Sequence, residues 1–323
     1  MDIKLILMVI SLLFLIGCKG GTQGPITTVD IYKGVDGLKM NFLKNAPSDE
    51  VFENSVMPVY IELRNEGAYN IVMGYLTVSL EEDYMEITNW PIKKPITGIV
   101  SDNQLVFDLK GKSKVSIEGE QGIVSLTANT KAIDELSEKH TSTILASACY
   151  EYETKLSQTV CIDTDVYNLR ETEKACEVKD ISLTSQGAPV AITKIETEML
   201  PHQDVAKIRP HFVIYVRNKG NGEVIDRGYV AEACSSAKIS KDKYNVVAIT
   251  AFLSNKQLDC DVTESDMIGY LKLKDKEDTI RCVLEEGIEE REGTYSTPLN
   301  IELDYGYTVS IAKDIEIKKI RKY

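Results

Sequence analysis

Beyond residue 37, apolar residues alternate with polar ones along short segments, and this period of two constrains the fold more than any other feature. The alternation is clear in the segments 59–64, 212–217, 247–252 and 301–305. A period of two places every second side chain on one face of an extended strand, whereas an amphipathic helix needs a period of about 3.6. We therefore expect the body of the chain to form β-strands.

Turn residues separate these segments. The turns at 65–67 and 218–222 contain Asn and Gly, which adopt positive φ angles at low cost. Strands that follow one another without long helices between them form antiparallel sheets, so the pattern predicts an all-β fold. One short helix is expected at 131–140, with Thr130 as its cap, in a loop between strands.

Two separate pieces of the sequence recur at nearly the same spacing. The first is a strand with its turn, and the second is a pair of tyrosines. The matches are Arg64 with Arg217 at an offset of 153 residues, and Tyr150 with Tyr305 and Tyr152 with Tyr307 at an offset of 155. A tandem duplication of a unit of about 150 residues accounts for both offsets.

A unit of this length with about seven short strands has the sequence form of an immunoglobulin-like sandwich. We therefore predict two tandem immunoglobulin-like antiparallel β-sandwiches behind an N-terminal signal or anchor helix. The first sandwich is assigned to residues 31–170 and the second to residues 171–323. The polar stretch 168–174 falls at the expected joint.

The first eighteen residues predict export from the cytoplasm. Leu5 to Ile16 form an apolar run whose one polar member is Ser11, and Gly17 and Cys18 follow it. A membrane-spanning helix needs about 20 apolar residues, so this run has the length of a signal-peptide core. Its end resembles the lipobox of exported lipoproteins. The resemblance implies a signal peptide over 1–17 and a diacylglyceryl group on Cys18.

The alternative for the leader is an uncleaved anchor helix that ends in a buried Cys18 thiol. Both alternatives tether the chain to a membrane. Residues 19–24 are polar and rich in Gly, so the segment 18–30 is expected to act as a flexible tether. We therefore expect the folded part to be extracytoplasmic, anchored to the cell membrane and standing off its surface.

The number of cysteines agrees with an oxidising compartment. Besides Cys18 the chain has six cysteines, and an even number permits three disulfides. An assumed hairpin at the end of the first unit sets one pair opposite each other, and loop proximity suggests the other two. The predicted pairs are Cys149–Cys161, Cys260–Cys282 and Cys176–Cys234. No Cys-x-x-Cys pair is present, so a zinc site of the usual spacing is not indicated.

Aromatic residues raise two further questions. The repeated tyrosines fit either a sugar-stacking platform or buried side chains that hydrogen-bond a neighbouring corner, and we favour the buried arrangement because sandwich strands often contain it. Trp90, the single tryptophan, is followed by Pro91 in a loop. It is a candidate partner contact, and packing over the edge of the sandwich is the alternative.

Charge and motifs exclude several classes of function. The 37 Lys and Arg against 50 Asp and Glu leave a net charge of -13, which argues against a nucleic-acid partner. The three histidines are scattered, and neither a His-Glu-x-x-His nor a Gly-x-Ser-x-Gly motif is present. The acidic runs do not match an ordered calcium loop. We therefore predict no metal ligand, no cofactor and no catalytic residue.

Three phrases of the sequence resemble a family of uncharacterised exported archaeal proteins. These phrases are residues 59–70, 149–163 and 186–220. The domains of that family are similar to the CARDB type of immunoglobulin-like module. The resemblance covers most of residues 37–320 and implies a fold and a compartment, since the family has no agreed activity.

Together these features predict a membrane-anchored, non-catalytic cell-surface lipoprotein. Its expected role is adhesion, envelope organisation or assembly of a surface complex, with a surface protein or a glycan as the partner. The alternative is an exported carboxylate-dependent enzyme that acts on envelope polymers. That alternative predicts two convergent acids in a cleft between the domains, at least one of them with a raised pKa.

Overall fold

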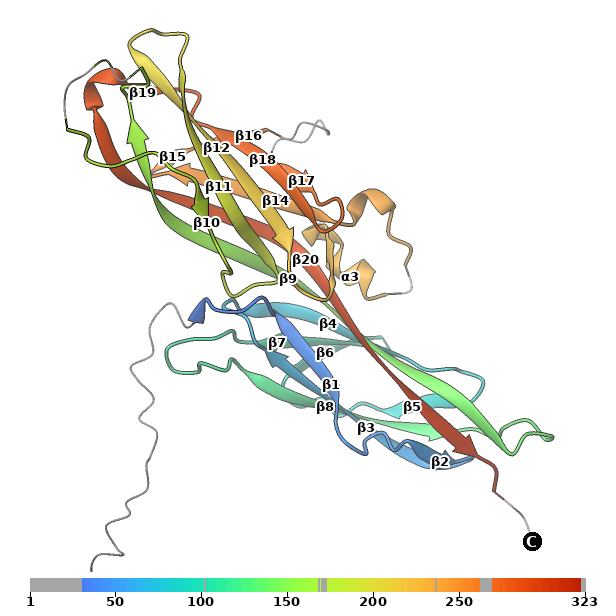
Figure 1. Cartoon of the computed structure of the whole chain (residues 1–323). Coiled ribbons are helices and arrows are strands. Elements are labelled where there is room, and N and C mark those ends of the chain that lie inside the picture. The colour runs from blue at the N-terminus through green and yellow to red at the C-terminus, as the bar shows by residue number, and fades with distance from the viewer. Residues whose placement is uncertain are drawn as a thin grey trace, which may run out of the picture.

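The computed structural model describes residues 31–101, 103–167, 169, 173–235, 237–261 and 269–320. Their regular secondary structure is almost entirely β-strand, which confirms the predicted all-β class. Figure 1 shows two lobes joined by the two longest strands. The predicted signal peptide, the lipidation site Cys18 and the tether over 18–30 lie outside the described residues.

Lobe 1 is built from the first part of the sequence around a four-stranded antiparallel sheet. The order β1-β3-β8-β5 joins β1 (Leu38–Phe42), β3 (Val56–Asn65), β8 (Gln121–Thr130) and β5 (Met85–Asn89). Along β3, Val59, Ile61 and Leu63 are buried while the residues between them face outward. The alternation predicted at 59–64 therefore directs one face of a central strand into the core.

Lobe 2 contains the corresponding sheet of six strands. Its strands are β10 (Ile181–Ser182), β11 (Val190–Pro201), β12 (Lys207–Asn218), β18 (Glu277–Val283) and β16 (Asp259–Asp261) in that order, with β19 (Ile288–Glu289) on β12. The predicted strand at 212–217 lies in β12, where Phe212, Ile214 and Val216 are buried.

A third sheet of ten strands belongs to both lobes. Its main path is β15 (Lys256–Gln257), β14 (Val246–Leu253), β20 (Thr294–Lys318), β9 (Lys139–Asp163), β4 (Ile71–Ser79), β7 (Gln104–Leu109) and β6 (Ile96–Ser101). Off this path, β13 (Glu223–Ile225) and β2 (Glu50–Phe52) pair with β20, and β17 (Tyr270–Lys272) pairs with β14. Buried side chains of all three sheets join in one hydrophobic core.

The two longest strands, β9 and β20, run through both lobes in opposite directions (Figure 1). Each has 25 residues, and they pair antiparallel along their whole length. The first part of β9, at 145–150, pairs with β4 of lobe 1. The first part of β20, at 299–304, pairs with β14 of lobe 2. Each strand therefore begins in one lobe and ends in the other.

The hairpin assumed at the end of the first unit is wrong. The residues at its expected turn, 154–156, lie inside the continuous strand β9, and Cys149 is opposite Thr308 of β20. The segment contains no Gly or Asn that would adopt a positive φ angle. The domain boundary at residues 170 and 171 stays a prediction from the sequence, although strands from both sides of it share the ten-stranded sheet.

The helix expected at 131–140 is also wrong. These residues form a loop that ends where β9 begins at Lys139, and the Glu53 carboxylate of a neighbouring loop accepts a hydrogen bond from the Ile133 N–H at 3.1 Å. The short helical pieces are η1 (Arg227–Tyr229), α3 (Val230–Ala233), η2 (Lys241–Lys243) and η3 (Glu290–Glu292). Among the described residues, no helix is long and apolar enough to cross a membrane.

His211 of β12 is a buried group with unsatisfied polar atoms. Its side chain is 5% exposed, and within the described part of the chain neither ring nitrogen has a hydrogen-bond partner. Burial lowers the pKa of His211, as do the charges of Arg209 and Arg281, while Glu198 and Glu285 act in the opposite direction. The folded protein therefore favours the neutral imidazole.

This burial predicts a loss of stability in acid. The unfolded chain takes up a proton at His211 below about pH 6.5, before the folded protein does, so the free energy of unfolding falls as the pH drops from there through the lowered pKa. His211→Phe is expected to reduce that fall and to raise the free energy of unfolding at pH 7 by about 1–3 kcal/mol, because no buried nitrogen is left unpaired. Urea unfolding measures both effects when it is repeated between about pH 5 and pH 8 in steps of about half a pH unit, a range that includes the ordinary pKa of histidine. An unchanged acid dependence in the variant would contradict the prediction.

Candidate functional site

The waist of the molecule, where β9 and β20 pass from one lobe to the other, is the candidate functional site. Four buried tyrosines meet there, since Tyr150 and Tyr152 of β9 lie opposite Tyr307 and Tyr305 of β20 in the register. Neighbouring rings have centroids between 5.5 and 6.3 Å apart in tilted or edge-to-face arrangements. These geometries are the favourable ones for aromatic pairs.

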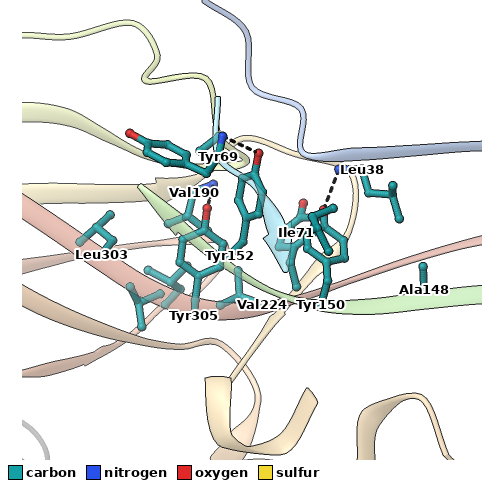
Figure 2. Packing of buried hydrophobic residues seen from close by; sticks show 14 of the residues in the cluster. Leu38, Tyr69, Ile71, Ala148, Tyr150, Tyr152, Val190, Val224, Leu303 and Tyr305 are labelled. Carbon is teal, nitrogen blue, oxygen red and sulfur yellow. Dashed lines mark hydrogen bonds between the residues drawn. The ribbon is translucent and has the colours of Figure 1, made fainter. Parts of the chain in front are cut away.

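One tyrosine of each strand holds the start of another strand, as Figure 2 shows. The Leu38 N–H, at the beginning of β1, donates to the Tyr150 hydroxyl at 2.9 Å. The Val190 N–H, at the beginning of β11, donates to the Tyr305 hydroxyl at 3.4 Å. One strand of each smaller sheet, β1 or β11, is therefore fixed at its start to the shared ladder.

The other tyrosine of each strand holds a turn. The Tyr152 hydroxyl donates to Asn65 Oδ1 at 3.2 Å, and the Tyr307 hydroxyl donates to Asn218 Oδ1 at 3.1 Å. Each asparagine oxygen also accepts from the N–H of the glycine two residues later, at 3.1 Å in both turns. A Cβ on Gly67 would overlap the Tyr152 hydroxyl. Asn65 and Asn218 are 153 residues apart, and Tyr152 and Tyr307 are 155 residues apart, so the same hydrogen bonds recur at the offsets found in the sequence.

The hydroxyl groups of these four tyrosines have the properties of structural groups. Burial raises the pKa of Tyr307 to about 12, and it raises the pKa of Tyr150 and of Tyr305 further above the ordinary value. The hydroxyls stay neutral and hydrogen-bonded. The buried arrangement favoured from the sequence is confirmed, since these rings present no exposed face to a sugar.

The outer face of the same ladder carries charged groups. Asp304 of β20 lies opposite Glu153 of β9. The Arg227 guanidinium donates to Asp304 at 2.9 Å and to Glu151 at 2.7 Å, and the Lys155 ammonium lies 3.1 Å from the Glu153 carboxylate. Burial raises the pKa of Asp304, against the opposing charge of Arg227. The direction of this pKa shift agrees with one requirement of the enzyme alternative, which also needs two convergent acids in a cleft between the domains.

An insert of lobe 2 reaches across to lobe 1 beside this cluster. Residues 226–245 lie between β13 and β14 and contain α3. Cys234, directly after α3, forms a disulfide with Cys149 of β9, and both residues are buried. The Cys234 carbonyl accepts hydrogen bonds from Thr77 of β4 and, at 3.0 Å, from Gln104 of β7. The insert is therefore fixed to the lobe 1 part of the shared sheet.

All six predicted cysteines are paired, but two of the three predicted pairs are wrong. The disulfides are Cys149–Cys234, Cys161–Cys176 and Cys260–Cys282. The last pair agrees with the prediction. The predicted pair Cys149–Cys161 is impossible in a straight β9, where a separation of twelve residues spans about 40 Å. The predicted pair Cys176–Cys234 is wrong because the chain after β9 folds back and brings Cys176 to Cys161.

Trp90 is half-buried in the loop between β5 and β6 and packs against the hydrophobic core. This position agrees with the packing alternative. Among the described residues, no group of three or more His, Cys, Asp or Glu side chains is placed to bind a metal ion.

A cleft of about 720 Å³ opens at the waist, between the edge of β9 and the loop that precedes β11. Its lining includes Tyr32, Tyr69, Lys155, Gln158, Gln186 and Asn300. The Tyr69 hydroxyl accepts from the Lys155 N–H at 2.8 Å and donates to the Lys155 carbonyl at 3.1 Å. Reasoning from the sequence missed this cleft. Its lining residues come from distant segments that meet only because β9 continues from lobe 1 into lobe 2, and no local motif marks them.

Comparisons with known proteins give a partial likeness to solved structures. No family model matches the chain, and no curated protein matches it. A chain of a type I cohesin–dockerin complex from Clostridium thermocellum is similar, with 19% identity, a TM-score of 0.25 and coverage of 36% of this chain and 85% of that one. A chain from a complex of the sixth cohesin of Acetivibrio cellulolyticus scaffoldin B with a dockerin is similar at 13% identity and a TM-score of 0.24, over 35% of this chain and 84% of that one.

Proposed function

We propose that this protein is a membrane-anchored, non-catalytic surface protein that serves adhesion, envelope organisation or the assembly of a surface complex. The observation that carries the proposal is the 25-residue ladder of β9 with β20, which joins the two lobes without a flexible linker. Such a body holds the loops of both lobes at fixed positions, and loops on a rigid scaffold are where proteins recognise partners. The partner is a surface protein or a glycan.

The three disulfides indicate an oxidising environment outside the cytoplasm. Within this compartment we propose attachment through the lipid on Cys18. Ile31, the first described residue, is buried, and Tyr32 lines the cleft at the waist. The described part of the chain therefore begins at the waist, and the two lobes extend to either side of it (Figure 1).

Cell fractionation of a Cys18→Ala variant tests the anchor. The variant is expected to lose the lipid and to move from the membrane fraction to the soluble fraction. Without the Cys18 thioether the protein carries no acyl chains that insert into the membrane. Mass spectrometry of the N-terminal peptide checks the modification, and Lys19→Ala is the control that keeps the cysteine. Wild-type protein found in the cytoplasm with reduced thiols would contradict the proposal.

Crosslinking on intact cells followed by mass spectrometry tests the assembly role. Crosslinks to a small set of surface proteins or to envelope glycans are the expected result.

The raised pKa of Asp304 beside Glu153 favours the second candidate, an exported carboxylate-dependent enzyme that acts on envelope polymers. Hydrolysis of an envelope glycan or peptide by the purified chain, lost in Asp304→Asn, would replace the first proposal with this one.

A further inference from the structure

Among the residues that the structure describes, the second half of β9 has an open edge on the side away from β20. Its pairing with β4 stops at Tyr150, whereas its pairing with β20 on the other side continues to Asp163. The Tyr69 hydroxyl binds both the N–H and the carbonyl of Lys155, so these groups point away from β20. Directions alternate along an antiparallel strand. The backbone groups of Ser157 and Thr159 therefore point to the same open side.

This open stretch has defined ends. Tyr69 occupies the edge at Lys155, and the disulfide to Cys176 brings another chain segment against Cys161. Between them, the Thr159 carbonyl accepts a hydrogen bond at 3.3 Å from the side chain of its neighbour Gln158. The 720 Å³ cleft lies along this stretch, and Ser157 and Gln158 are part of its lining. The cleft is therefore bordered by strand backbone on one side.

In lobe 1, a short strand covers the end of the β20 edge, at residues that correspond to 161–163 of β9 at the offset of 155. The last residues of β20 are held on one side by β9, and on the other side β2 pairs parallel with them, from Glu50 opposite Glu316 to Phe52 opposite Lys318. The Val51 side chain of β2 is half-buried and packs against the core. The chain itself thus shows what occupies such an edge, namely a short extended segment with one apolar side chain directed inward.

We propose that the cleft binds an extended peptide segment of a partner protein, which adds as a strand to the edge of β9 at Ser157 and Thr159. Main-chain hydrogen bonds give affinity in this mode, and alternate side chains give specificity. The inward side chain of the segment is aliphatic or aromatic, because Tyr69, Leu156 and Ile301 supply the apolar part of the lining. This proposal rests on the assembly role and names the surface that performs it.

A peptide titration tests the edge. The probe is the synthetic peptide of residues 48–54, which contains β2, with its ends blocked, added to the isotope-labelled full chain in detergent. Binding with a Kd below about 1 mM is expected, with chemical-shift changes at the amides of Ser157 and Thr159. Changes confined to residues 316–318 would show that the peptide replaces β2 in lobe 1, and they would overturn the proposal, as would no change at all.

Matched variants separate the backbone contribution from that of the side chain. Ser157→Pro removes an N–H that points to the open side, so pairing with β20 is kept while the Kd is expected to rise at least about tenfold. Ser157→Ala keeps the N–H, and its Kd is expected to match the wild type. A peptide methylated on alternate backbone nitrogens is expected to lose binding to the unchanged protein, which tests the proposal even if the proline variant fails to fold. Equal binding of both peptides would overturn it.

The titration and the anchoring experiment have separate outcomes. Fractionation of Cys18→Ala reports attachment alone, whereas the titration reports the β9 edge alone. Association of the protein with itself that depends on concentration and is lost in Ser157→Pro would assign the edge to a second copy of this chain. That result would overturn the proposal of a partner peptide while leaving the anchor intact.

Discussion

Tyr305→Ala is expected to lower the free energy of unfolding by about 4 kcal/mol. The side chain is fully buried at the waist, and removing a large aromatic group from a core leaves a cavity that costs about 3–5 kcal/mol. The Val190 N–H and the Thr154 hydroxyl also lose their shared partner. Because the ring lies on a strand that serves both lobes, both lobes are expected to lose stability together.

Urea unfolding followed by two signals measures this effect. Far-UV circular dichroism reports all strands, while the fluorescence of Trp90 reports lobe 1, in which the single tryptophan lies. Both transitions are expected to shift to the same lower urea concentration. Tyr305→Phe, which keeps the ring, is expected to cost about 1 kcal/mol. A shift of one signal without the other would show that the lobes unfold independently.

Removing the disulfide between Cys149 and Cys234 by alanine at both positions is expected to cost about 4.5 kcal/mol. The two cysteines are 85 residues apart in the sequence, and in the chain-entropy model the stabilisation increases with the length of the closed loop. The same change at Cys161 and Cys176, which are 15 residues apart, is expected to cost about 3 kcal/mol and serves as the matched control.

Urea unfolding compares the two double variants, and hydrogen exchange locates the change. Amides of α3 and of its neighbours in the insert are expected to exchange faster without Cys234, since the disulfide and the contacts of its carbonyl fix the insert to lobe 1. A loss of stability in the Cys149 and Cys234 variant that is smaller than in the control would contradict the assignment of the longer loop as the main constraint.

The strands and their buried faces were predictable from the sequence. The alternation at 59–64 and 212–217 marks residues that lie in β3 and β12 with the expected side chains inside. The repeated tyrosines were predictable as buried hydrogen-bonded groups, and their partners Asn65 and Asn218 belong to the repeated turns. Period-two patterning records which face of a strand is buried, and this information is local.

The passage of β9 and β20 between the lobes was not predictable in the same way. A hairpin and a straight strand bury the same alternate residues, so the pattern around Tyr152 fits both. The signal that separates them is the segment Thr154-Lys155-Leu156, which lacks any residue suited to a tight turn. The wrong cysteine pairs and the missed cleft both follow from this point, because each depends on where the second half of β9 lies.

The continuous ladder also determines how the molecule responds to mechanical load. A 25-residue strand extends over about 80 Å, so the peptide backbones of β9 and β20 both reach from one end of the body towards the other. Tension applied between the far ends is carried by the covalent backbones of the two antiparallel strands. Bending at the middle requires many hydrogen bonds between β9 and β20 to break together. The two ends of the body are thus kept at a constant spacing.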